Sequence, residues 1–139
     1  MINFTINQLI PQRDPILMVD ELLGVDGEQA QTCFTIRPEN IFLDEEGWFE
    51  ENGMIEHIAQ SASAFAGYKA ILAGATEPPL GYIGEVKNFH CYRRPIVGEQ
   101  LLTTITLGPE VNGVTLLTGQ THVGDEMIAQ TQMKIFIKA

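Results

Sequence analysis

The sequence predicts an α+β protein in which one long antiparallel sheet curls around a single helix. Three observations lead to this prediction. Residues 52–74 have the small and apolar composition of a buried helix, strand-like segments precede them, and every segment after Gly81 has the pattern of a strand. Because strands and helices do not alternate along the chain, antiparallel pairing is favoured over a parallel sheet. The length of 139 residues predicts one domain over residues 1–139.

The N-terminal residues 1–10 are expected to form a short amphipathic lead-in. Three of its side chains are predicted to contact the core: Phe4, Leu9 and Ile10. Pro11 and Pro15 follow, and proline fixes its own φ and restricts the residue before it. The segment between them is therefore predicted to be extended or turned.

A hairpin and a loop are predicted to connect this lead-in to the helix. We expect strands over 16–25 and 29–36, joined by a turn at Asp26-Gly27, because Asp-Gly between apolar runs is a strong hairpin signal. Residues 38–51 are expected to form an acidic loop. Within it, the Trp48-Phe49 pair is predicted to cover the core.

The helix is expected to begin at Asn52, as its N-cap, and to stop at Gly74. One stripe along it is polar or small: Glu56, Gln60, Ser63 and Gly67. The rest of its surface is apolar or tiny, which is typical of a buried helix, and the small residues at 59–67 allow the sheet to approach closely. Burial of an unpaired carboxylate costs several kcal/mol, so the sequence indicates a chemical role for Glu56.

The remaining strands are predicted from alternation and turn signals. Turns are expected at Asn112-Gly113 and Gly124-Asp125, and the strands lie over 82–94, 101–107, 114–122 and 127–137. The last strand places these side chains on one face: Met127, Ala129, Thr131, Met133, Ile135 and Ile137.

The composition excludes several classes of function. A formal net charge of −10, with 8 Lys and Arg, argues against a nucleic-acid partner. No apolar segment reaches the length of a membrane span, so we expect a cytoplasmic protein without membrane contact. Cys33 and Cys91 lack a CxxC spacing and are predicted to be reduced thiols. Phosphate-binding glycine loops, GxSxG, zinc-ligand spacings and dinucleotide fingerprints are missing from the sequence, so no metal or cofactor is expected.

Three segments carry a resemblance to a known family. Residues 9–20 begin Leu-Ile-Pro-Gln-Arg-Asp-Pro and end Val-Asp, residues 53–60 contain Glu-His-Ile-Ala-Gln, and residues 92–101 contain Arg-Arg-Pro. In this order they resemble the hotdog-fold 3-hydroxyacyl-[acyl-carrier-protein] dehydratases. The Gly-Trp-Phe at 47–49 is more similar to a divergent dehydratase-like subgroup than to the rest of the family. Some members of this subgroup are associated with polyene-type lipid or pigment synthesis.

The resemblance implies that the catalytic residues are Glu56 and the residue at position 12, where the family has histidine. Gln12 cannot take a proton at neutral pH, and loss of a general base typically costs about two to four decades in rate. In this family the site lies between subunits, so Gln12 would face Glu56 across a dimer. His57 is the candidate replacement base. Adjacent helix positions diverge by about 100°, which favours a structural or interface role for His57, and Asp14 is a distant candidate for a second carboxylate.

The candidate substrate-binding residues are Gln60, Arg93 and Arg94. Gln60 alternatively bonds Ser63 or backbone groups. The two arginines either meet an anionic ligand or acidic carrier domain, or are simply solvated.

The resemblance therefore implies a dehydratase-like protein that acts on or binds 3-hydroxyacyl thioesters of acyl carrier protein or coenzyme A, in fatty-acid or polyene-type lipid synthesis. A homodimer, or a heterodimer with a histidine-bearing paralogue, is expected. Two alternatives stay open: a thioesterase that uses Glu56 alone, and a catalytically silent acyl-thioester-binding subunit. The acyl length accepted is expected to depend on packing among Phe65, Ile58 and the sheet.

Overall fold

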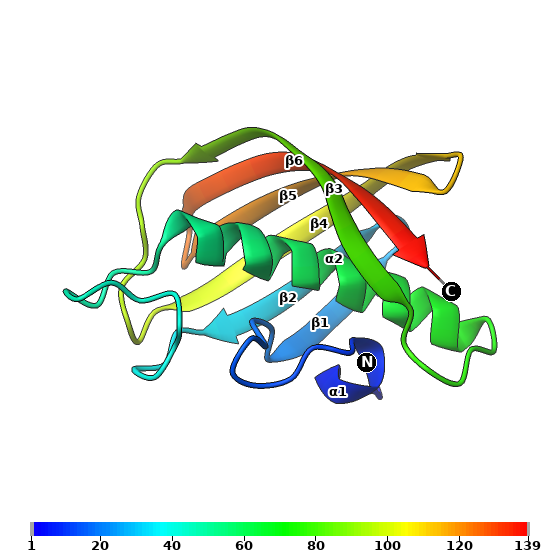
Figure 1. Ribbon diagram of the computed structural model, residues 1–139, viewed down its shortest axis with the longest axis horizontal. Coiled ribbons are helices and arrows are strands. Elements are labelled where there is room, and N and C mark those ends of the chain that lie inside the picture. Colours follow the sequence, from blue (N-terminus) through cyan, green and yellow to red (C-terminus); the bar gives the residue numbers. More distant parts are fainter. Residues whose placement is uncertain (1, 139) are drawn as a thin grey trace.

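One long helix lies in the concave face of a curved sheet (Figure 1). The computed structural model describes residues 2–138, without the side chains of Leu80, Tyr82, Ile137 and Lys138, so both ends of the predicted domain, Met1 and Ala139, lie outside the described residues. The elements follow the chain in the order α1 (Ile6–Leu9), β1 (Glu21–Asp26), β2 (Gln29–Thr35), α2 (Glu51–Leu72), β3 (Leu80–Cys91), β4 (Gln100–Val111), β5 (Val114–Val123) and β6 (Glu126–Lys138).

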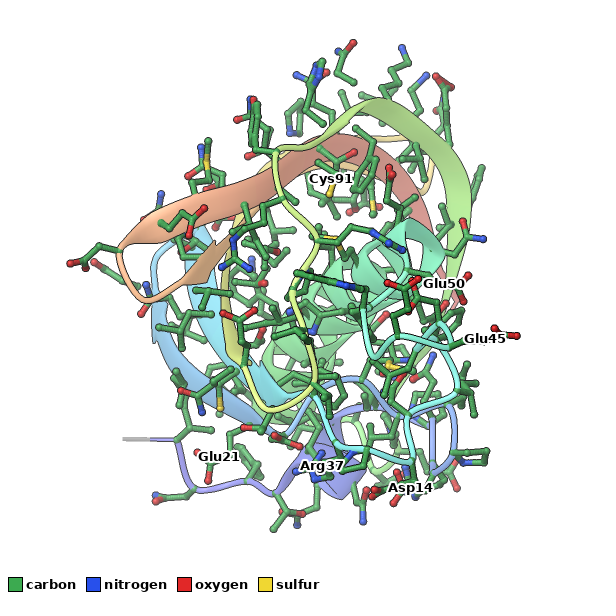
Figure 2. All side chains as sticks on the ribbon, turned by 90° about the vertical axis from the view of Figure 1, so that its left-hand side faces the viewer. Asp14, Glu21, Arg37, Glu45, Glu50 and Cys91 are labelled. Atoms are coloured by element: carbon green, nitrogen blue, oxygen red, sulfur yellow. The ribbon has the colours of Figure 1, made fainter. Side chains whose placement is uncertain are left out.

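The sheet has six strands in the order β1-β2-β4-β5-β6-β3, and every neighbouring pair is antiparallel. This confirms the predicted α+β architecture, and it is the hotdog arrangement that the resemblance implies. Figure 2, seen from the end where α2 begins, shows the sheet curving around the helix. The strand after the helix, β3, lies at one edge of the sheet, beside the last strand of the chain.

The predicted turns are confirmed by their backbone. Gly27 has a φ of 61°, and β1 and β2 pair from Asp26 and Gln29 onward. Asn112 and Gly113 both have positive φ, at 53° and 80°, which is the backbone that a tight two-residue hairpin requires.

The first predicted strand was placed too early, since β1 begins at Glu21 and not at residue 16. The backbone of the preceding segment is bound by side chains of α2. Gln60 donates to the carbonyl of Ile16 and accepts from the amide of Met18, and His57 bonds the carbonyl of Met18. These groups are therefore taken by the helix and cannot join a strand ladder.

The predicted N-cap at Asn52 is also wrong. The helix begins at Glu51, and its cap residue Glu50 makes no side-chain capping bond. The preceding loop fixes the start instead: Phe49 is fully buried, its amide donates to the carbonyl of Pro95, and the amide of Glu50 donates to the carbonyl of Phe42. At the other end the prediction holds, because α2 ends at Leu72 and Gly74 follows with a φ of 105°.

Small residues bring α2 close to its neighbours, as predicted. A β-carbon at Gly67 would overlap the carbonyl oxygen of Leu9, so α1 can lie against α2 only because this residue is glycine. A β-carbon at Gly119 would come within 2.6 Å of Ile58. The inward face of β6 is buried at Ala129, Thr131, Met133 and Ile135, whereas the side chain of Ile137 lies outside the described residues.

No helix within residues 2–138 combines the length and the apolar character that a membrane crossing needs.

Candidate active site

A pocket of about 240 Å³ lies beside the N-terminal half of α2. The lead-in segment, β3 and β6 form its other walls. It is lined by Gln12, Glu56, Ala59, Gln60, Ser63, Gly81, Ile83 and Ile135. Among the described residues that line it, Glu56 carries the only ionisable side chain. The polar-to-small stripe predicted along the helix, from Glu56 to Ser63, is thus the helical wall of this pocket.

Glu56 is half-buried at this pocket and not enclosed in the core, which corrects the expectation of a buried carboxylate. Gln60, one turn later, donates from Nε2 to Glu56 Oε2 at 2.7 Å. Among the described side chains and backbone groups, none is hydrogen-bonded to the second carboxylate oxygen of Glu56. One oxygen is therefore held in place, while the other is available to a molecule in the pocket.

Gln60 is almost fully buried and its amide orientation is fixed by its partners. Its Oε1 accepts from the Met18 amide at 2.6 Å, and its Nε2 donates to the Ile16 carbonyl at 2.8 Å as well as to Glu56. Because a backbone N–H can only donate, the carbonyl end of the Gln60 amide must face Met18. Gln60 therefore bonds backbone groups, which is one of the alternatives expected from the sequence. It also donates a hydrogen bond to Glu56, the catalytic candidate.

Gln12 lies at the same pocket as Glu56 within one chain. The lead-in segment thus folds back onto its own helix, and a meeting of the two residues across a dimer stays a prediction. The Oε1 atom of Gln12 is buried and has no hydrogen-bond partner among the described residues. A buried acceptor without a donor is unfavourable by about 1–3 kcal/mol, so this atom is suited to a donor supplied by a ligand.

His57 points into the core instead of the Glu56 pocket and is fully buried. Its Nδ1 lies 2.6 Å from the Met18 carbonyl and its Nε2 lies 2.7 Å from Thr103 Oγ1. A carbonyl only accepts, so Nδ1 carries the proton and Nε2 accepts from Thr103, which in turn accepts from Thr121 at 2.7 Å. Burial lowers the pKa of His57 to about 4, which keeps the ring neutral.

Both ring nitrogens of His57 are therefore engaged, and the ring does not line the Glu56 pocket. This geometry favours the structural role over the catalytic one. Together with Gln60, His57 holds the backbone of Met18 at both its N–H and its C=O. The two side chains thereby fix the segment that leads from Gln12 to β1.

Arg93 and Arg94 are not brought to the pocket. Arg93 bonds both carboxylate oxygens of Glu99, at 3.0 and 3.3 Å, and its Nε bonds Glu126 at 3.2 Å. Arg94 pairs with Asp44 at 3.1 Å. These contacts tie the connection after β3 to the start of β6 and to the loop before α2. The substrate-binding role of the two arginines stays a prediction.

The sequence reasoning missed several parts of this site. Ile83 and Gly81 reach the pocket because β3 lies beside β6, a pairing that no local pattern predicts. The N–H and C=O of Met18 bind Gln60 and His57, and no side-chain motif can indicate a role for backbone groups. Asp14 lines a different pocket, with Asp20 and Arg37; Figure 2 shows Asp14 and Arg37 close to each other at one end of the fold.

Solved structures with this fold include a dehydratase and a thioesterase. The dehydratase heterocomplex ApeI:P from Xenorhabdus doucetiae matches with a TM-score of 0.89 and 14% identity, over 98% of this chain and 92% of that one. A hypothetical thioesterase with coenzyme A from Streptococcus pneumoniae TIGR4 matches with a TM-score of 0.66 and 8% identity, over 86% of this chain and 85% of that one. At these identities the likeness confirms the hotdog fold alone.

Sequence comparison gives the family. The 3-hydroxyacyl-[acyl-carrier-protein] dehydratase FabZ of Natranaerobius thermophilus is 30% identical over 131 residues, which cover 92% of this chain and 91% of that protein. The FabZ of Actinobacillus pleuropneumoniae serotype 5b is 26% identical over 137 residues. The family described as ApeP-like, ApeP dehydratase, matches residues 4–139. This confirms the resemblance to a divergent dehydratase-like subgroup. The chain is a dehydratase-like protein that belongs to the ApeP-like family.

Proposed function

We propose that this protein binds the acyl group of a 3-hydroxyacyl thioester in the Glu56 pocket and acts on it as a dehydratase. The proposal is carried by two groups that line the same pocket. One is the Glu56 carboxylate, which Gln60 holds, and the other is the unpartnered Oε1 of Gln12. A 3-hydroxyl group is a donor that fits Gln12 Oε1. The FabZ relatives and the ApeP-like family support this substrate class.

Dehydration removes a proton from C2 and the hydroxyl group from C3, and releases water. Both steps need a titratable group within hydrogen-bond reach of the substrate. In this chain Glu56 takes the C2 proton on its unpartnered oxygen and, now protonated, returns it to the departing hydroxyl. Gln12 holds the hydroxyl through a hydrogen bond but cannot protonate it. We therefore expect turnover well below that of a site with both a carboxylate and a histidine.

The test is incubation of the purified protein with a 3-hydroxyacyl thioester of pantetheine, followed by mass spectrometry of the acyl group. Loss of one water from the acyl group is expected, and Glu56→Gln should reduce it at least a hundredfold. Glu51→Gln is the matched control, because Glu51 is an exposed glutamate in the first turn of the same helix. Equal rates in the two variants would contradict the assignment of Glu56.

Thioester hydrolysis is the second candidate, because a site with a single carboxylate can activate water as a general base. Hydrolysis releases a free thiol and leaves the hydroxyacyl group intact, whereas dehydration releases no thiol. Thiol titration in the same incubation separates the two reactions. Tight binding without either product would instead indicate a catalytically silent subunit.

We also propose that a second subunit pairs along β3. In the described sheet β3 is an edge strand that pairs with β6. Ile83 and Ile135 are cross-strand partners, yet Ile135 is 2% exposed and Ile83 is 40% exposed, since no described strand pairs with the outer side of β3. The partner is a second copy of this chain or, as the ApeI:P heterocomplex suggests, a related dehydratase subunit. A histidine on that subunit would supply the base that Gln12 does not.

Light scattering on the purified chain tests this association. A homodimer gives twice the chain mass of 15.4 kDa, and Ile83→Lys should halve the observed mass, because lysine on a sheet edge opposes pairing. Leu116→Lys is the control, since Leu116 is also a partly exposed apolar residue but lies on β5, away from the edge. A monomer at all concentrations contradicts the homodimer. Co-purification with a related subunit would then support the heterodimer, and failure to co-purify would contradict it.

A cytoplasmic location is proposed on the state of the cysteines. Cys33 and Cys91 are free thiols, and burial raises the pKa of both. Free thiols of this kind are typical of a reducing compartment.

A further inference from the structure

The pocket that holds Glu56 ends at a side chain that also borders a second pocket. Ile135 of β6 lines the Glu56 pocket and also lines a pocket of about 240 Å³ farther along α2. We call this second space the distal pocket. Its apolar lining residues are Ala66, Leu107, Leu117 and Ile135, and its other lining residues are Lys69, Glu110, Gly113 and Thr115. Ile135 is almost completely buried and is the one described residue that lines both spaces.

The two pockets lie along the same side of the helix. Ala59 and Ser63 line the Glu56 pocket, and Ala66 lines the distal pocket. Residues at this spacing are neighbours on one helix face, and all three side chains are small. With a rise of 1.5 Å per residue, Ser63 lies about 10 Å from Glu56 along the helix axis and Ala66 about 15 Å.

We propose that Ile135 sets the length of the acyl chain that this protein accepts, by closing the Glu56 pocket before the distal pocket. The proposal rests on the proposed acyl-thioester function. Ile58 and Phe65, which the sequence suggested for this role, are buried in the core and line neither pocket. An acyl chain that starts at Glu56 and follows Ala59 and Ser63 meets Ile135 next.

Truncation of Ile135 should join the two spaces into one channel. In the distal part of that channel, Leu107 and Leu117 provide apolar surface against which methylene groups can pack. Each methylene that leaves water for an apolar site increases affinity about fourfold. Long acyl chains therefore gain affinity from the truncation, and chains too short to reach Ile135 do not.

The experiment measures the affinity of acyl-pantetheine thioethers by calorimetry, with butyl, hexyl, octyl, decyl and dodecyl chains. Thioethers carry the pantetheine arm that acyl carrier protein and coenzyme A share, and they are neither hydrolysed nor dehydrated. For the unaltered protein, affinity should rise with chain length and then stop rising. For Ile135→Ala the affinity should continue to rise with chain length. The dodecyl compound should bind this variant at least tenfold more tightly than it binds the unaltered protein.

Ile128→Ala is the matched control. It removes the same atoms from a fully buried residue of the same strand, but Ile128 lies in another core cluster and lines neither pocket. It should leave the chain-length profile unchanged. Filling the distal pocket with Ala66→Leu should reverse the gain in the Ile135→Ala background. If Ile135→Ala does not fold, Ile135→Val makes a smaller opening at a smaller loss of stability and should shift the profile in the same direction.

The outcomes separate this proposal from the function on which it rests. An unchanged profile in a folded Ile135 variant, with good binding of short chains, overturns the role of Ile135 and leaves the acyl-thioester function in place. A gain in the Ile128→Ala control of equal size also overturns it, because a general loosening of the core then explains the effect. Failure of every thioether to bind overturns both proposals.

Discussion

Gln60 and Glu56 lie one turn apart on α2 and are joined by a hydrogen bond of 2.7 Å from the Gln60 amide to one carboxylate oxygen. The same amide group also bonds Ile16 and Met18. The orientation of the catalytic candidate and the path of the lead-in segment are thus fixed by one side chain. Because Gln12 lies on that segment, both polar walls of the pocket depend on Gln60.

Replacing Gln60 with methionine should weaken the fold and the site together. Methionine has a similar volume but makes none of these bonds, which leaves the buried Met18 amide without an acceptor. We expect the free energy of unfolding in urea to fall by about 2–4 kcal/mol. Gln31→Met is the control, since Gln31 is exposed and makes one long bond of 3.4 Å to Thr104; it should change stability by less than about 0.5 kcal/mol. Equal effects would show that the Gln60 bonds add little.

His57 should make the stability of the protein depend on pH. Its pKa is lowered from 6.5 to about 4 in the folded state, so the unfolded chain binds the proton more tightly. The stabilisation is therefore complete above pH 6.5 and is lost as the pH falls toward 4. Between pH 7.5 and pH 4.5 the loss should be about 2–3 kcal/mol.

Urea unfolding of the unaltered protein and of His57→Asn at both pH values isolates this contribution, because other titrating groups are common to both proteins. His57→Asn should lower stability at pH 7.5 and should flatten the pH dependence. His90→Asn, an exposed histidine of β3, should keep the slope of the unaltered protein. A slope that survives in His57→Asn would refute the assignment.

Arg93 should prove to be a structural residue. Its hydrogen bonds lower the pKa of Glu99, so their contribution is present at neutral pH and is lost as the pH falls below the ordinary glutamate range. Arg93→Gln should reduce stability at pH 7 by about 1 kcal/mol, after allowance for solvent screening, and by less at pH 3. The affinity for acyl-pantetheine thioethers should not change; a weakened affinity in a folded variant would restore the predicted substrate-binding role.

Gln12→His should increase turnover. The pocket already holds the carboxylate and lacks a second titratable group, and a positioned general base is typically worth about two to four decades in rate. We expect enoyl formation to rise about a hundredfold, with a pH profile that follows an imidazole. Gln12→Asn is the control, since it shortens the amide without adding a titratable group. No gain in a folded Gln12→His would mean that a side chain at position 12 does not reach the reacting groups of the substrate.

The sequence predicted most of the fold because local patterns determine it. The glycines of the hairpin turns, the alternation in β4 to β6 and the small residues of α2 all follow from rules that act over a few residues. The resemblance to the dehydratase family is confirmed, and it pointed to Glu56 and to the change at Gln12. The single-domain organisation stays a prediction.

Other features followed only from the tertiary structure, because they depend on groups far apart in the chain. The binding of Ile16 and Met18 by side chains of α2 keeps that segment out of the sheet, although its sequence has the pattern of a strand. The placement of β3 beside β6 brings Ile83 and Ile135 to the pocket, which neither strand indicates alone. Glu56 was identifiable from its position in a small-residue helix. The fixed amide of Gln60, the inward-facing His57 and the place of Ile135 at both pockets were decided by packing, since each depends on which distant group its side chain meets.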